Sequence, residues 1–466
     1  MTELHWLTAA EAGRRFRDKT LSPVELLKAL LARAEKLNPS LDVYVALDAQ
    51  RALDQAKAAE KEITAGRARS PLHGIPIGLK DIIDLEGLPT TCGSKILQDN
   101  VAKADSHGVA LLREAGMVFP GKVQTLEFAL GGPSFDLPKP PSRNPWNRDH
   151  HPGGSSSGSG AGVAAGFFPV ALGTDTGGSI RNPASCCGIV GLKPTYGLVS
   201  RRGVFPLAFS LDHLGPLSRT VEDTALVLDA LAEQDAQDPA SRPRPDAWSY
   251  ARDLWKGVKG LKIGFVRHFH ERDMPADPEM AASLEEAAKF FKSEGATIRD
   301  VTLPDLNEFS AINRNILQAE AWAIHQEWMR TRPGDYGQIG RRRLASGAFL
   351  TAGDYLDAQR RRLQMIQAAE AVFREVDVLL CASSMDPPCR IDDLAAIGRT
   401  YPRQARTPFN VTGQPAITLM SGLSKDGLPL SIQIAGPHWG EAKILQTAAA
   451  YERATEWHKM RPRDAA

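Results

Sequence analysis

The sequence has few cysteines and no long apolar run among its 466 residues. The five cysteines are odd in number and include no Cys-x-x-Cys pair, which argues against a zinc ribbon and a disulfide framework. Sparse cysteines of this kind are typical of reduced, cytoplasmic proteins. No run of about 18 apolar residues occurs, so we expect no transmembrane helix. The first residues also lack the apolar core of a secretory signal.

The sequence also has no large excess of positive or negative charge. The formal net charge is +1, and no basic block is interleaved with aromatic residues. This composition lacks the electrostatic footprint of nucleic-acid binding. Arginine runs at 341–343 and 360–362 lie in helix-like sequence and are interpreted as solvated faces. We therefore expect a small molecule as the partner, without nucleic acid or membrane, and a monomer or homodimer.

What the sequence does contain is an alternation of helix-like and strand-like segments. Residues 1–70 look helical, and two stretches there, Thr8 to Glu11 and Ser22 to Glu25, match the capping box. Segments that look like strands follow at 72–85, 261–265 and 376–381, and Asp426-Gly427 joins the two halves of a hairpin. The alternation predicts one α/β domain over residues 1–466, with a mixed sheet between helix layers. Residues 306–372 are mostly helical and are expected to form a cap over the site.

Residues 131–187 are rich in Gly, Pro and Ser, which is also the composition of a linker. The apolar run VAAGFFPVAL lies inside this region, so we interpret it as packed core with close backbone approaches. Within it, GSSSG at 154–158 matches the nucleophile elbow GxSxG, with Ser156 at its centre. The elbow needs a buried strand before it, and NPWNRDHHP cannot supply one. A P-loop is excluded because Gly-Lys-Ser/Thr is absent.

Histidines offer a second candidate site. HFH at 268–270 follows a strand-like segment, as in metal-dependent amidohydrolases. Such a site needs further ligands at strand ends, and of the later histidines His325, His438 and His458 only His438 is a candidate for such a position. We therefore predict no metal, and interpret 268–270 and His150-His151 as exposed loop histidines.

The stretch GTDTGGSIR at 173–181 offers a third candidate site. Paired glycines allow successive amides to converge on one point, and a serine beside such a nest suits acyl transfer. A serine also needs a base. Lys80 lies in the apolar run GIPIGLKDII, where burial would lower its pKa and yield a neutral amine. The alternatives are a structural turn at 173–181 and an ion pair of Lys80 with Asp81 or Asp84.

Taken together, the motifs GIPIGLKD, GGSSSG and GTDTGGSIRNPASCCG, which place Lys80, Ser155 and Ser179 at intervals of 75 and 24 residues, resemble the amidase signature family. TTCGSKIL, NPWN and GQPAITL extend the likeness over nearly the whole chain. The resemblance implies a single α/β domain and a Ser–cis-Ser–Lys triad without cofactor or metal. Ser179 would be the nucleophile, Ser155 the bridging serine after a cis peptide bond, and Lys80 the proton acceptor. The main-chain amides of Thr176, Gly177, Gly178 and Ser179 would form the oxyanion hole.

Substrate contacts are expected at the loop 131–136, where the family has its acyl pocket, and beside the triad. The residues expected there are Gly131, Gly132, Phe135, Ser156 and Arg181. The sequence departs from the family at Val123-Gln124, where Thr-Asn is usual.

Three functions remain open at this point. The first is a stand-alone amidase for small or aryl-containing amides, with carbamates and esters as further candidates. The alternative is the glutaminase component of a tRNA-dependent amidotransferase. The third is a non-catalytic binding protein on the same scaffold. Bulky apolar residues at 204–209 favour the first.

Overall fold

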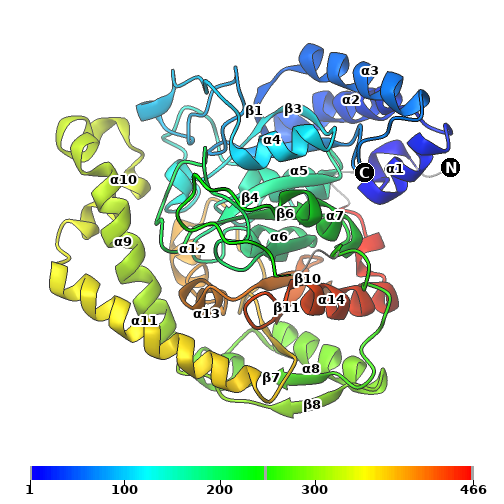
Figure 1. The fold of residues 1–466 in the computed structure, drawn as a ribbon. Coiled ribbons are helices and arrows are strands. Elements are labelled where there is room, and N and C mark those ends of the chain that lie inside the picture. Colours follow the sequence, from blue (N-terminus) through cyan, green and yellow to red (C-terminus); the bar gives the residue numbers. More distant parts are fainter. Residues whose placement is uncertain (1–2, 246–248, 463–466) are drawn as a thin grey trace.

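The strands of the protein form one mixed sheet in the computed structural model, which describes residues 3–245 and 249–462 (Figure 1). The strands are β1 (Tyr44–Leu47), β2 (Pro76–Lys80), β3 (Val118–Val123), β4 (Val170–Asp175), β5 (Val190–Lys193), β6 (His213–Ser218), β7 (Lys262–Phe265), β8 (Thr297–Asp300), β9 (Val378–Ala382), β10 (Ala416–Leu423) and β11 (Pro429–Ala435). Their order in the 11-stranded sheet is β1-β3-β2-β4-β6-β5-β10-β11-β9-β7-β8. Parallel and antiparallel neighbours both occur, which confirms the predicted α/β fold with a mixed sheet.

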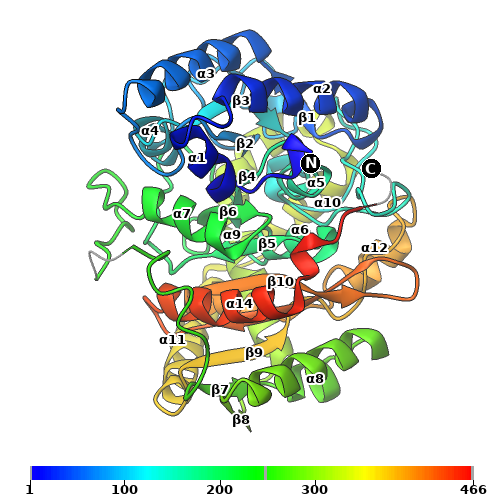
Figure 2. The same ribbon diagram turned by 90° about the vertical axis from the view of Figure 1, so that its right-hand side faces the viewer.

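Helices cover both sides of this sheet. They are α1 (Ala9–Arg17), α2 (Pro23–Leu41), α3 (Ala49–Thr64), α4 (His107–Glu114), α5 (Ser157–Ala165), α6 (Arg181–Cys187), α7 (Val221–Leu231), α8 (Pro278–Ser293), α9 (Leu306–Thr331), α10 (Gln338–Gly347), α11 (Ala352–Phe373), α12 (Leu394–Thr400), α13 (Thr407–Thr412) and α14 (Glu441–Thr455). Helices α1, α7 and α14 lie on one side, and α9, α10 and α11 lie on the other (Figures 1 and 2). The single-domain assignment stays a prediction.

The N-terminal segment is less helical than its sequence suggests. Ser22 forms the predicted capping box, because its hydroxyl accepts from the amide of Glu25 and the Glu25 carboxylate accepts from the amide of Ser22. The second predicted box is half formed: the hydroxyl of Thr8 accepts from the amide of Glu11, but the carboxylate of Glu11 accepts from Arg15 instead of from Thr8. The expectation of helix throughout 1–70 is wrong. Helix α2 ends at Leu41, and β1 follows as an antiparallel partner of β3.

The glycine-rich region packs as core, as predicted. A Cβ at Gly78 of β2 would lie 2.5 Å from the ring of Phe168, and one at Gly162 of α5 would lie 2.2 Å from it. The two glycines let this ring lie between strand and helix. The close packing fixes α5 against β2.

The strand order brings the sequence motifs to one edge of the sheet. Strands β2 and β4 are parallel neighbours, with Leu79 paired with Leu172. Their carboxyl ends therefore lie at the same edge, and these ends carry Lys80 and Asp175. Helix α5 begins at Ser157, so Ser155 and Ser156 lie immediately before its first turn. Loops at the carboxyl ends of strands are the usual place for sites in open α/β sheets.

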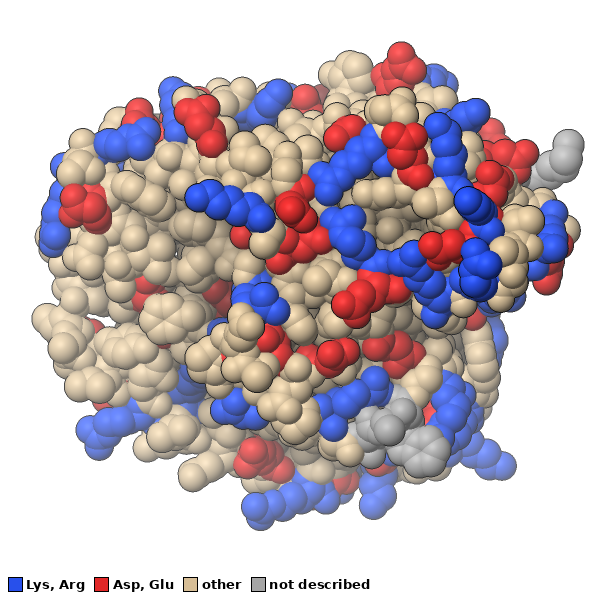
Figure 3. All heavy atoms as spheres, turned by 45° about the horizontal axis from the view of Figure 1, so that its top comes forward, with Lys and Arg blue, Asp and Glu red and all other residues tan. Residues whose placement is uncertain are grey.

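On the face drawn in Figure 3, acidic and basic side chains are interspersed. Within residues 3–245 and 249–462, no helix is both long and apolar enough to cross a membrane.

Candidate active site

The amine of Lys80 lies between two hydroxyl groups at the end of β2. Its Nζ is 2.7 Å from Oγ of Ser155 and 2.7 Å from Oγ1 of Thr174. Lys80 and Ser155 have no exposed surface. The alternative of an ion pair with Asp81 is wrong, because Asp81 pairs with Lys122 at 3.0 Å.

The surroundings of Lys80 favour its neutral form. Burial lowers the pKa of Lys80 to about 7, and the more distant Asp175, Asp212 and Cys92 oppose the shift only in part. A large fraction of this amine is therefore unprotonated at neutral pH and can accept a proton.

A main-chain hydrogen bond joins Ser179 to Ser156, the residue that follows Ser155. The Gly154–Ser155 peptide bond is cis, as the resemblance implied. The amide of Ser156 donates to the carbonyl oxygen of Ser179 at 3.2 Å. Ser179 is 8% exposed, whereas Ser155 is fully buried, so Ser179 is the serine of this pair that retains contact with solvent.

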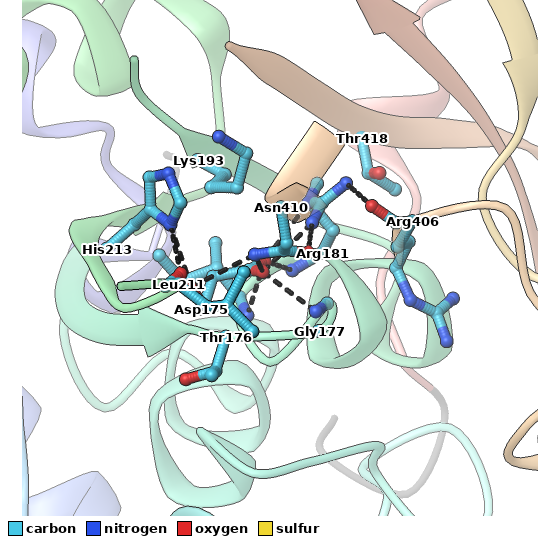
Figure 4. Close-up of polar contacts among 12 residues, drawn as sticks. Asp175, Thr176, Gly177, Arg181, Lys193, Leu211, His213, Arg406, Asn410 and Thr418 are labelled. Atoms are coloured by element: carbon cyan, nitrogen blue, oxygen red, sulfur yellow. Dashed lines mark hydrogen bonds and ion pairs between the residues drawn. The ribbon is translucent and has the colours of Figure 1, made fainter. Parts of the chain in front are cut away.

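The turn before Ser179 is organised by a buried carboxylate. Asp175 accepts from the amides of Gly178 at 2.7 Å and Ile180 at 3.1 Å. It also pairs with Arg181, whose Nη2 is 2.9 Å from its Oδ1 (Figure 4). Burial alone would raise the pKa of Asp175, but the Arg181 guanidinium and the Asn410 amide hold it well below its usual range. Asp175 therefore holds the loop as a permanent anion.

This arrangement changes the expected oxyanion hole. The amide of Gly178 already donates to Asp175 and is not available to a substrate, so its assignment to the hole is wrong. Within the part of the chain that the structure describes, the amides of Thr176, Gly177 and Ser179 form no hydrogen bond. Thr176 is fixed through both its side chain and its main chain, because its hydroxyl donates to Asp212 at 2.6 Å and its carbonyl accepts from Asn313 of α9 at 3.0 Å.

Two residues expected to contact substrate have structural roles instead. Ser156 is buried, and its hydroxyl bonds to the main chain of Thr174. Arg181 is fully buried, and all five of its N–H donors face partners in the protein. The acceptors are Asp175, the Arg406 carbonyl, Gln433 and Asn410. Neither side chain can bind a substrate without breaking these bonds.

The remaining predicted contacts lie in the loop before residue 136. A Cβ at Gly131 would lie 3.0 Å from Ile339 of α10, and one at Gly132 would lie 3.7 Å from Ile397 of α12. Phe135 is 51% exposed and lies 5.7 Å from the guanidinium of Arg143. Their contact with substrate stays a prediction. Gln124, where the family differs, donates to the carbonyl of Pro140 at 2.7 Å rather than to the triad.

A cavity of about 240 Å³ reaches the site from the side of Thr174. Val204, Phe205, Leu207 and Phe209 line it, together with Asp212. Burial raises the pKa of Asp212 to about 6, although Thr176 and the amides of Leu207 and Ala208 oppose this shift. Apolar side chains therefore form much of the cavity wall, but Arg201, Arg202 and Asp238 also line it. The carboxylate of Asp212 lies beside the loop of Ser179, because it accepts from Thr176.

The histidines are not the exposed loop residues that we expected. His270 and His151 are 2% and 6% exposed, respectively. His270 lies near Glu271 and Glu285, which together could approach one cation. The guanidinium of Arg267 already pairs with both carboxylates, however, so the cluster is charge-compensated.

Several residues that shape the site were not predicted from the sequence. Asp175 and Thr174 belong to the GTDTGGSIR motif itself, where an acidic residue two positions before paired glycines could have suggested an anchor for the turn. Asn313, Asp212 and Asn410 carried no local signal, because only the tertiary fold brings them to the loop.

Comparisons with known proteins give a consistent likeness. The family model described as Amidase matches residues 25–445. The chain is 39% identical to the A subunit of the glutamyl-tRNA(Gln) amidotransferase of Geobacter sp. strain M21, over 98% of this chain and 99% of that protein. Among solved structures, the native peptide amidase of Stenotrophomonas maltophilia has a TM-score of 0.86 and 30% identity, covering 98% of both chains. A bacterial aryl acylamidase has a TM-score of 0.89 and 26% identity, also covering 98% of both chains.

Proposed function

Because the chain belongs to the amidase family, whose members hydrolyse carbon–nitrogen amide bonds, we propose that it cleaves a carboxamide through an acyl-enzyme on Ser179. The observation that supports this most directly is the 2.7 Å contact between the buried amine of Lys80 and the hydroxyl of Ser155. A serine hydroxyl becomes an effective nucleophile only when a neighbour takes its proton, and the lowered pKa of Lys80 suits it to that role.

The proposed reaction begins with a proton relay. Ser179 passes its proton to Ser155 as Ser155 passes its own to the neutral Lys80. The Ser179 Oγ forms a bond to the amide carbon, and the carbonyl oxygen takes up the negative charge. The proton then returns from Lys80 through Ser155 to the leaving nitrogen, and the carbon–nitrogen bond breaks. Water hydrolyses the resulting ester by the same relay in reverse, which restores all three side chains.

The developing oxyanion needs donors that are fixed in advance. We assign the main-chain amides of Thr176, Gly177 and Ser179 to this role. The amide of Gly178, bonded to Asp175, instead holds the loop in shape. Three amides on a rigid turn can stabilise the charge without reorganising during the reaction.

For the substrate, glutamine is the first candidate. The full-length identity of 39% to the A subunit of an amidotransferase supports a glutaminase role more strongly than the stand-alone interpretation that the apolar 204–209 segment suggested. In that role the chain would act with further subunits rather than as a monomer or homodimer.

A stand-alone amidase is the second candidate function. The cavity beside Thr174 is lined by Val204, Phe205 and Leu207, which suits an apolar or aryl group. The likeness to an aryl acylamidase supports the same interpretation.

Two experiments test these proposals. Labelling by an uncharged fluorophosphonate tests the nucleophile. We expect labelling of the wild type and none of Ser179→Ala, whereas a non-catalytic protein would show no difference between them.

Release of glutamate from glutamine, compared with hydrolysis of acyl anilides, aliphatic amides, esters and aryl carbamates, separates the substrates. Preference for glutamine, with co-purification of a partner protein, would support the first candidate; rapid anilide hydrolysis by the isolated chain would support the second.

A further inference from the structure

Arg406 lies against the residue that precedes the proposed nucleophile. It stands immediately before α13 and is 2% exposed. Gly178 has φ +121°, and a Cβ there would lie 2.4 Å from Nε of Arg406. The absence of a side chain at Gly178 is therefore what allows this guanidinium to approach the Ser179 loop. Gln404, two residues earlier, donates to the carbonyl of Gly177 at 3.4 Å, and this hydrogen bond keeps the Arg406 segment close to the Ser179 loop.

The hydrogen bonds of Arg406 are incomplete. Its Nη1 donates to the Ser383 carbonyl at 3.0 Å and to the Ser384 hydroxyl at 2.7 Å. Its Nε is buried without a partner, and its Nη2 donates to no group in the described part of the chain. Arg181 is the contrast, because all of its donors are used. Figure 4 shows the guanidinium of Arg406 turned away from the cluster that surrounds Asp175.

The charge of Arg406 is also uncompensated. Among residues 3–245 and 249–462, no carboxylate forms an ion pair with it; Asp175 pairs with Arg181, and Asp386 pairs with Arg403 at 2.6 Å. Burial lowers the pKa of Arg406 to about 10, so the group is still a cation at neutral pH. A buried cation without a counter-ion is costly, which points to an anion supplied from outside the protein.

The unused donors have the geometry that a carboxylate needs. Nε–H and Nη2–H point in the same direction along one edge of the planar guanidinium, and two parallel N–H donors match the two oxygens of a carboxylate. In this protein Arg181 uses that same edge to hold Asp175. From these observations we infer that Arg406 binds a carboxylate on the substrate, so that the enzyme selects carboxamides that carry a carboxylate a few bonds from the scissile amide.

This inference rests on the proposed amide hydrolysis and narrows its substrate class. Glutamine belongs to the class, as do the half-amides of dicarboxylic acids. Simple aliphatic amides and uncharged acyl anilides do not belong to it.

The test compares substrates that differ only in the charge. Succinamate and succinamide, and likewise glutaramate and glutaramide, differ by one carboxylate. For the wild type we expect kcat/KM to be about tenfold to a hundredfold higher for the acid of each pair, the range for a charge-assisted bidentate contact. In Arg406→Gln the ratio should fall to near one, through loss of kcat/KM for the acid of each pair. Arg406→Lys keeps the positive charge but loses the two parallel N–H donors, so its ratio should lie between those of the wild type and Arg406→Gln.

The matched control is Arg361→Gln on the exposed face of α11, which should keep the wild-type ratio. A second readout needs no turnover: succinate should protect wild-type Ser179 from the fluorophosphonate and should not protect Arg406→Gln. Equal kcat/KM for acid and diamide in the wild type, an unchanged ratio in Arg406→Gln, or absence of protection by succinate would overturn the inference.

If Arg406→Gln did not fold, three measurements would still test the inference. They are the ratio of kcat/KM for acid over diamide in the wild type, the protection of the wild type by succinate, and the ratio in Arg406→Lys. Failure of the proposed hydrolysis is distinguishable, since it would appear as loss of fluorophosphonate labelling itself. Labelling without acid selectivity would overturn the role of Arg406 alone.

Discussion

The amine of Lys80 is as close to the hydroxyl of Thr174 as to that of Ser155, at 2.7 Å in both cases. A neutral amine accepts one hydrogen bond and donates two. If it accepts from Ser155, the hydroxyl of Thr174 provides an acceptor for one of its N–H groups. Thr174 therefore orients the lone pair of Lys80 toward Ser155 and acts as a positioning residue in the proposed relay.

Replacing Thr174 by Val should lower kcat about tenfold, because a buried hydrogen bond contributes on the order of 1 kcal/mol. Loss of this acceptor also disfavours the ammonium form, so the pKa seen in the rate profile should move down. Steady-state kinetics as a function of pH measure both effects. Thr174→Ser, which keeps the hydroxyl, is the control and should stay near the wild type. A Val variant with wild-type kcat and profile would exclude the positioning role.

Hydrolysis should depend on pH through Lys80. The folded-state pKa of about 7 lies below the ordinary value of 10.5, so the active neutral amine forms as the pH rises through 7. The rate should increase about tenfold per pH unit below pH 7 and level off above it. Asp175 stays ionised across this range, whereas Asp212, with its pKa near 6, adds a second and smaller limb. The pH–rate profiles of Asp212→Asn and the wild type separate the contributions of Asp212 and Lys80. If the rate of the Asn variant did not rise with pH near pH 7, the role of Lys80 would be contradicted.

Removal of the charge of Asp175 should be strongly destabilising. Asp175→Asn leaves the buried Arg181 unpaired, and breaking a buried pair in this way costs about 3–5 kcal/mol. The folded-state pKa of Asp175 is depressed, so its contribution to stability is present above the unfolded pKa and is lost as the pH falls. Denaturant unfolding measures the loss. Asp392→Asn, which breaks an exposed pair with Arg390, should leave the free energy of unfolding almost unchanged. Equal effects of the two variants would refute the anchoring role of Asp175.

A methyl group at Gly178 should disturb the loop of Ser179. At φ +121° a side chain is strained, and the new Cβ would lie 2.4 Å from Arg406. We expect Gly178→Ala to lose about 2–3 kcal/mol of stability and most of its activity. Gly398→Ala in α12 is the matched control, because no atom lies within 4 Å of its Cβ and the substitution should be neutral or slightly stabilising. Thermal unfolding and fluorophosphonate labelling report the two effects. Equal stability and equal labelling of Gly178→Ala and Gly398→Ala would show that the close approach of Arg406 to Gly178 matters neither for stability nor for activity.

The contact between Lys80 and Ser155 was expected from the resemblance to the amidase signature family, whereas the residue types alone indicated only that Lys80 and the serines need partners. A lysine in an apolar strand and a serine in a glycine-rich turn both need a partner. The mixed sheet was predictable from the alternation of strand and helix patterns and from the hairpin at Asp426-Gly427, where β10 and β11 indeed pair.

Residues that act through tertiary contacts could not be found in this way. Nothing in the sequence around Arg406 and Arg181 distinguishes their roles, which depend on the packing of residues 404–406 against 177–178. The strand β1 was not predicted because it has only four, partly exposed residues and lies between two segments with clear helical patterns. The use of the Gly178 amide by Asp175 likewise depends on how the loop closes, which residue types do not specify.

In the proposed mechanism neutral Lys80 activates Ser179 through Ser155, and the rate of fluorophosphonate labelling as a function of pH measures this activation most directly. We predict that labelling of the wild type rises with pH and levels off above about pH 7, and that Lys80→Met and Ser155→Ala each slow it about 10²- to 10⁴-fold. Labelling of Lys80→Met at the wild-type rate, with the same dependence on pH, would contradict this mechanism.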